Sequence, residues 1–243
     1  MQKSKILDII QKYSVNGRGN SVLINVDEHQ KLTINFRPAD RQYFFNGNFE
    51  KFDLEETEIG IYDTEALVKI MSALDNEFKM KIGYERKNPF TLQFEDSAID
   101  VKFLLADTSL EVFAKPDGQK AFPDQHVTFE LDKETMSRFI KSKNAIGSDK
   151  INFVLLTDGN KIDLILNYSE TSTNRIQMTV EGEVTTQLDE PLAFSADIVK
   201  DIFAANMNCA TAKFEASLAG LLTLTFEGED WSTKYLVPKM QLG

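Results

Sequence analysis

The sequence predicts an α+β fold built from two similar domains, each combining helices with antiparallel strands. The main observation is an internal repeat. Shifting the chain by 132 positions brings residues 67–104 onto 199–236, and shifting it by 130 brings residues 6–34 onto 136–164. Self-similarity of this kind indicates that one structural unit is duplicated. Chance matches between apolar strands do not give two long alignments whose offsets differ by only two positions.

The aligned positions are largely apolar, which is expected when two copies build the same core. We therefore expect both copies to fold alike. The matched groups are Leu67, Ile70 and Met71 with Val199, Ile202 and Phe203; Ile6, Ile9 and Ile10 with Met136, Phe139 and Ile140; Leu23 and Ile24 with Phe153 and Val154; and Ile34 with Leu164.

The length and composition fit two folded domains. The chain has 243 residues, of which 42% are hydrophobic, so each half is long enough to bury its own core. The sizeable linker-like stretch is 107–126, which contains Pro116 and Pro123. We predict an N-terminal domain over 1–106, a connector over 107–126 and a C-terminal domain over 127–243.

The first domain is predicted to begin with an amphipathic helix over 3–13, because Ile6, Ile9 and Ile10 recur at helical spacing. Asp63 marks the start of a second helix, since its side chain can accept from the free N–H groups of a first helical turn. The pattern of apolar residues predicts strands at 21–26, 31–36, 43–49, 58–62, 78–85, 91–95 and 99–105.

The second domain repeats this order. A helix over 133–145 is capped by Asp132, and another helix is predicted over 197–206. The Asp-Gly-Asn run at 158–160 is a strong hairpin signal. Strands are predicted at 127–131, 151–156, 162–168, 175–184, 192–195, 211–217, 221–227 and 234–237.

No arrangement in the sequence indicates catalysis. His29 and His126 have no Cys or His neighbour at metal-ligand spacing, and the common nucleophile, phosphate-loop and zinc-helix motifs are absent. The acidic runs at 55–58 and 227–230 are best interpreted as solvated turns. We therefore expect no catalytic centre, no metal and no cofactor, and an enzyme of unidentified chemistry ranks third among the hypotheses.

The sequence favours a cytoplasmic location. No apolar run has the roughly 18 residues of a membrane span, and the N-terminal residues lack the apolar stretch of a signal peptide. The single Cys209 cannot form an internal disulfide, as is typical of a reducing compartment.

The chain is acidic, but its helices carry cations. The net charge of −11 argues against a nucleic-acid partner, although the distribution of charge matters more than the total. At about 100° of rotation per residue, several cations lie off the apolar helix faces. They are either the solvated cations of ordinary amphipathic helices or a surface that faces phosphates. The residues in question are Lys5, Lys12, Lys69, Arg138, Lys141 and Lys200.

With these features together, the chain resembles the DNA sliding clamps over its whole length, most closely the phage type with two domains. The duplicated helix-and-sheet unit carries the resemblance, together with the run IGIYD at 59–63 that leads into a helix. The ending at 226–240 also fits, and its string YLVPK is similar to the closing strand of cellular clamps of the proliferating-cell-nuclear-antigen kind.

The resemblance implies a homotrimeric ring of six such units that encircles double-stranded DNA and acts as a polymerase processivity factor without catalysis. The helices would line the hole, where the six cations would touch phosphates without reading bases. Two positions depart from a basic lining. Asp8 matches Arg138 of the other copy, and Asp201 matches Lys69.

The resemblance also implies an apolar site for DNA polymerase and clamp-loader peptides, beside the connector and the last strand. The same residues can instead simply pack the connector down, and the sequence leaves both interpretations open. The alternative function is a duplicated protein-binding or adaptor module, viral structural or regulatory, that does not encircle DNA. The expected partner-binding residues are Leu110, Val112, Phe113, Tyr235, Val237, Pro238 and Met240.

Overall fold

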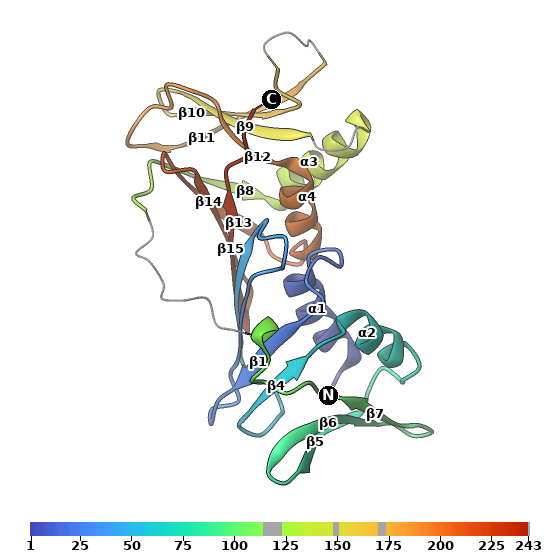
Figure 1. Cartoon of the computed structure of the whole chain (residues 1–243). Coiled ribbons are helices and arrows are strands. Elements are labelled where there is room, and N and C mark those ends of the chain that lie inside the picture. The colour runs from blue at the N-terminus through green and yellow to red at the C-terminus, as the bar shows by residue number, and fades with distance from the viewer. Residues whose placement is uncertain (114–122, 148–150, 170–173, 243) are drawn as a thin grey trace. The chain divides into compact units, whose positions relative to one another are not determined.

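The structure, a computed structural model, contains two compact units, each made of helices and antiparallel strands (Figure 1). It describes residues 1–113, 123–147, 151–169 and 174–242.

The two units divide the chain within the predicted connector. The first unit is Met1–Gly118 with Glu229–Thr233, and the second is Gln119–Gly228 with Lys234–Gly243. Residues 114–122 of the connector lie outside the described part. The repeat placed Glu229–Thr233 in the C-terminal domain, whereas this segment packs with the first unit.

The first unit contains two antiparallel sheets, with strand orders β3-β2-β1-β4 and β5-β6-β7. Its elements follow the predicted order, with ends that differ by up to three residues. They are α1 Lys3–Ser14, β1 Val22–Val26, β2 Leu32–Phe36, β3 Phe44–Phe49, β4 Thr57–Ile61, α2 Thr64–Ser72, β5 Lys79–Glu85, β6 Asn88–Glu95, β7 Asp100–Leu104 and a 3-10 turn Glu111–Phe113.

Local sequence explains both helices of the first unit. In α1, Ile6, Ile9 and Ile10 are buried as their spacing predicted. In α2, the Asp63 carboxylate accepts a hydrogen bond from the backbone N–H of Ala66 at 2.8 Å, which confirms the predicted cap. Both helices pack against apolar strand residues, which together line a small core cavity of about 30 Å³.

The second unit contains one continuous antiparallel sheet, in which β8 pairs with both β11 and β13. Strand order is β12-β9-β10-β11-β8-β13-β14-β15. The elements are β8 Val127–Asp132, α3 Lys133–Ile146, β9 Asn152–Asp158, β10 Lys161–Leu166, β11 Ile176–Val184, β12 Leu192–Ser195, α4 Ala196–Ala205, β13 Thr211–Ser217, β14 Leu221–Glu227 and β15 Trp231–Pro238.

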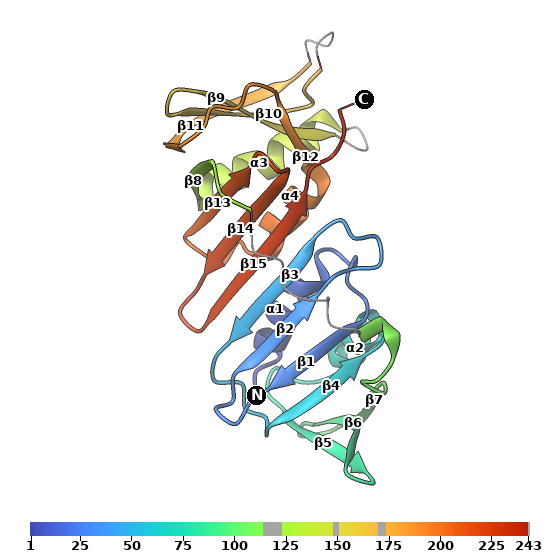
Figure 2. The same cartoon turned by 60° about the vertical axis from the view of Figure 1, so that its left-hand side comes forward.

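The helices α3 and α4 lie on one face of this sheet (Figure 2). Asp132 caps α3 by accepting from the N–H of Thr135 at 2.7 Å, and this hydrogen bond lowers the pKa of the Asp132 carboxyl. An aromatic cluster fills the core beneath the helices. The Phe203 ring meets the rings of Phe139 and Phe214 edge to face, with centroids 5.1 and 5.6 Å apart.

The duplication holds in three dimensions. Strands β5 and β13 match at an offset of 132, and the orders β3-β2-β1-β4 and β11-β10-β9-β12 are the same. In one strand, the repeat predicted from the sequence is out of register by one residue. Ile24 lies opposite Ile34 and Leu155 lies opposite Leu164, so Ile24 corresponds to Leu155 and not to Val154.

Candidate functional site

Helix α3 presents cations to solvent along one side. Arg138 and Lys141 are exposed while Phe139 is fully buried, so the predicted orientation of this helix is correct. Arg138 forms an ion pair with Glu134 one turn earlier. Lys133, which the sequence reading missed, is also exposed. It lies eight positions before Lys141, a spacing that places both residues on one side of a helix.

Helices α2 and α4 differ at their matching positions. Lys69 is exposed and forms an ion pair with Glu65 at 2.7 Å, and this hydrogen bond raises the pKa of the Lys69 ammonium. Its match on α4, Asp201, is buried and lies 3.3 Å from the ammonium of Lys200. Lys200 is half-buried, so α4 presents less positive charge to solvent than α2 does.

Helix α1 also presents little positive charge. The Lys5 ammonium donates to the backbone carbonyls of Glu50 and Lys51, at 3.2 and 2.7 Å. Lys5 is therefore half-buried and engaged within the first unit.

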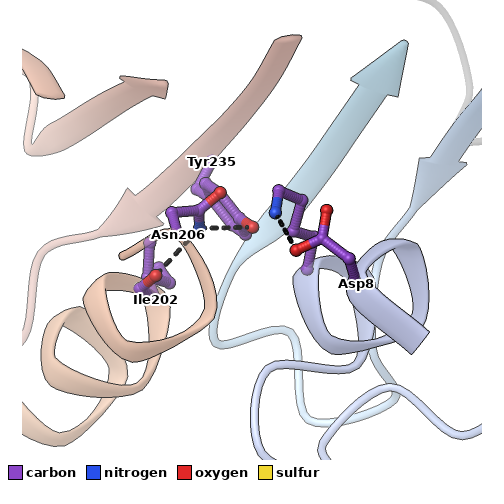
Figure 3. Close-up of polar contacts among 5 residues, drawn as sticks. Asp8, Ile202, Asn206 and Tyr235 are labelled. Atoms are coloured by element: carbon purple, nitrogen blue, oxygen red, sulfur yellow. Dashed lines mark hydrogen bonds and ion pairs between the residues drawn. The ribbon is translucent and has the colours of Figure 1, made fainter. Parts of the chain in front are cut away.

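Lys12 is fully buried, so the expectation that it faces DNA is wrong. Its ammonium lies 2.6 Å from the carboxylate of Asp8 (Figure 3) and 4.1 Å from the ring centroid of Trp231. A buried lysine needs partners of this kind, because an isolated charge is costly to remove from water. The spacing of four residues between Asp8 and Lys12 was a sequence signal for such a pair.

The predicted partner-binding residues of the first unit do not share one environment. Leu110 and Val112 are exposed, at 45% and 52%. Phe113 is buried, and it packs so closely on Gly60 that a β-carbon there would lie 2.8 Å from the phenyl ring. Phe113 therefore anchors the start of the connector and is not available to a partner.

The last strand, β15, also contributes side chains to the core of the second unit. Tyr235 and Val237 are buried, so the expectation that they contact a partner is wrong. The Tyr235 hydroxyl accepts a hydrogen bond from Asn206 at 2.9 Å (Figure 3), and its ring meets Phe226 edge to face. Alternation along β15 turns these two residues inward, whereas Pro238 is exposed.

Met240 is half-buried on an apolar patch that the sequence reading missed. We call Val154, Ile165 and Ala193 the outer patch; they pack together on β9, β10 and β12. The uninterrupted apolar runs at 153–155 and 164–166 were the available signal, because a strand buried on both faces loses the polar half of its alternation.

Among the strand edges that are open in the described part of the chain, those of β7 and β11 are considered for assembly. In the first unit, β7 pairs with β6 alone, and Leu104 at its end is 64% exposed. In the second unit, residues 176–181 of β11 pair with β10 on one side, while β8 reaches only residues 182–184 on the other. Open edges can accept a further strand.

The described residues contain no group of three or more His, Cys, Asp or Glu side chains placed to hold a metal ion. Among the same residues, no helix is long and apolar enough to cross a membrane.

Comparison with known proteins identifies the fold. No protein-family model matches the sequence, and no curated protein matches it either. Solved structures do match. A chain of the PCNA2–PCNA3 complex from Sulfolobus tokodaii superposes with a TM-score of 0.72 at 12% identity, covering 98% of this chain and 97% of that one. Proliferating cellular nuclear antigen from Entamoeba histolytica superposes with a TM-score of 0.72 at 14% identity, covering 99% and 96%. The predicted fold is confirmed: this chain has the duplicated α+β fold of these PCNA structures.

Proposed function

We propose that this protein is a DNA sliding clamp, a ring that encircles duplex DNA and tethers a DNA polymerase without catalysing a reaction. The observation that carries the proposal is the PCNA fold over nearly the whole chain. Topological linkage of this kind raises the effective concentration of the polymerase at the primer end. We assign it to the cytoplasm, and we extend the proposal to a phage-encoded protein acting in the cytoplasm of its host.

The proposed DNA contacts are made by exposed helix cations. We assign the main contacts to Lys69, Arg138 and Lys141, with lesser roles for Lys5 and Lys200, which are half-buried. The ion pairs of Lys69 and Arg138 with carboxylates one turn away do not prevent this. Exposed pairs at this spacing contribute little, so the cation can exchange onto a phosphate. Such contacts carry no sequence information, which suits a protein that slides.

We propose that the ring is a homotrimer closed by strand pairing between subunits. The open edges of β7 and of residues 176–181 of β11 support this, since a head-to-tail contact joins two different surfaces and forms a ring when its rotation closes. Exposed apolar residues gather on the sheet that contains β7, among them Tyr84, Phe90 and Leu104.

Replacing Leu104 with aspartate is expected to weaken the trimer, because a charge would enter the proposed subunit contact. Leu104 is 64% exposed, so the fold of the subunit should be kept. Leu218→Asp is the matched control, since Leu218 is 44% exposed and follows β13 in the turn to β14, neither of which is an edge strand. Light scattering over a concentration series measures the effect. A trimer that persists unchanged in Leu104→Asp contradicts the proposed contact.

Encirclement itself is tested with a short linear duplex that carries biotin at both ends. A ring threads over open ends and is retained when streptavidin is then added, whereas streptavidin added first prevents entry. Fluorescence anisotropy at low salt measures retention. Binding that does not depend on the order of addition would contradict the ring and favour the adaptor hypothesis. The fold match is to PCNA structures, which supports the clamp over the adaptor.

We assign partner binding to the exposed members of the predicted set, Leu110 and Val112 in the first unit and Pro238 in the second. Met240 is half-buried, so in the second unit we assign the apolar contact to the outer patch on which Met240 packs. The proposed partners are the DNA polymerase and a clamp loader, each presenting an apolar peptide anchor.

A further inference from the structure

The outer patch lies on the face of the second unit's sheet that is turned away from the helices. On β9, Phe153 contacts Phe139 of α3, so the next residue, Val154, points to the opposite face. Val154, Ile165 and Ala193 are nevertheless at most 3% exposed. Something therefore covers this face, and the residues packed on it are Leu156, Tyr168 and Met240.

Met240 reaches the outer patch on a segment that leaves the sheet after β15. Its backbone N–H donates to the carbonyl of Ala193 at 2.9 Å, and the N–H of Lys239 donates to the carbonyl of Gly220 at 2.8 Å. Strand β12, which contains Ala193, is an edge strand. The segment thus begins to add to the open edge of β12 in the way that an extended peptide adds to a sheet.

Gly220 is suited to holding this segment. Its φ is +87°, a conformation that glycine adopts without strain. A β-carbon there would also lie 2.3 Å from the Cδ atom of Lys239. A larger residue at position 220 would therefore displace the side chain of Lys239.

The attachment is small. One half-buried side chain and two backbone hydrogen bonds hold residues 239 and 240, and the following residues Gln241 and Leu242 are exposed. Each ordered residue loses backbone freedom, which offsets much of what these contacts contribute. A segment held in this way can be displaced by a peptide that makes the same contacts and others besides.

We propose that the outer patch is a peptide-binding site, that residues 239 and 240 of the chain itself occupy it, and that Met240 competes with the anchor of an incoming peptide. The peptide that displaces them is extended and has one long apolar side chain. This side chain covers the outer patch, and a backbone N–H of the peptide donates to the Ala193 carbonyl. A peptide therefore binds only when its contacts with the outer patch are more favourable in free energy than those of Met240. The assignment of this peptide to a polymerase or clamp loader rests on the proposed function. The competition between Met240 and a peptide does not depend on it.

The test uses a synthetic peptide with the chain's own sequence, VPKMQLG, as the probe. The full-length protein and its Met240→Ser variant are titrated to millimolar peptide, and methyl NMR signals of Val154, Ile165 and Ala193 are followed. We expect Met240→Ser to bind the probe at least about fivefold more tightly than the unaltered chain, because its patch is no longer occupied.

Leu242→Ser is the matched control, since Leu242 lies in the same segment but is exposed. It should bind the probe no better than the unaltered chain, and a probe with serine in place of methionine should not shift the signals. Equal affinity for the unaltered chain and Met240→Ser, or no binding to either, overturns the inference. The assay contains no DNA, so its failure is distinct from failure of the end-blocking test.

Discussion

Replacing Tyr235 with alanine is expected to destabilise the second unit by about 3–5 kcal/mol, because it removes a fully buried aromatic ring and leaves a cavity. The ring packs edge to face on Phe226, and its hydroxyl is bonded to Asn206. A contact residue for partners would instead leave stability unchanged when truncated. Denaturant unfolding followed by circular dichroism measures the effect.

Tyr235→Phe is the control that separates the hydroxyl from the ring. It keeps the packing on Phe226 and removes only the acceptor for Asn206, whose amide still donates to the carbonyl of Ile202 at 2.8 Å. A loss of about 1 kcal/mol is expected. If Tyr235→Ala unfolds at the same denaturant concentration as the unaltered protein, the core assignment of Tyr235 is wrong.

Reversing both Arg138 and Lys141 to glutamate is expected to weaken binding to duplex DNA by about tenfold or more. Each subunit then loses two exposed cations from α3 and gains two anions, and every subunit of a ring carries the change. Since each phosphate contact contributes about 0.9 to the slope of log affinity against log salt, the magnitude of the slope should fall by about 2 for each subunit whose α3 touches the DNA. Anisotropy over a salt series measures both quantities.

Lys161→Glu supplies the control for a change of charge alone. Lys161 is exposed at the start of strand β10 and is not on a helix, so its reversal should change DNA affinity far less. Circular dichroism verifies that each variant is folded. Equal losses of binding free energy per reversed residue in Lys161→Glu and in the double variant would show that overall charge, and not the α3 surface, governs binding.

Much of the fold followed from the sequence. Hydrophobic spacing placed α1, and the caps at Asp63 and Asp132 placed the starts of α2 and α3. These features are local, since a helix face and a capping hydrogen bond involve residues a few positions apart. The outer patch was missed because alternation indicates which residues share a face, but not whether that face is later covered.

The candidate site was predicted less well. The helical wheel placed Arg138 and Lys141 correctly on the exposed side of α3. It failed for Lys12, since a wheel gives the direction of a side chain and not what lies in that direction. Here the ring of Trp231, which is 219 positions away in the chain, lies against the ammonium. No local pattern contains that contact.

The sequence by itself determined that this protein is a duplicated α+β chain that resembles the sliding clamps. Duplication and hydrophobic periodicity can be read directly from the order of the residues. Only the tertiary structure decided which residues are surface and which are core. It buried Lys12, Phe113, Tyr235 and Val237, left Arg138 and Lys141 exposed, and set Met240 on the outer patch. The physical reason is that burial depends on every segment that packs against a residue, and those segments come from distant parts of the chain.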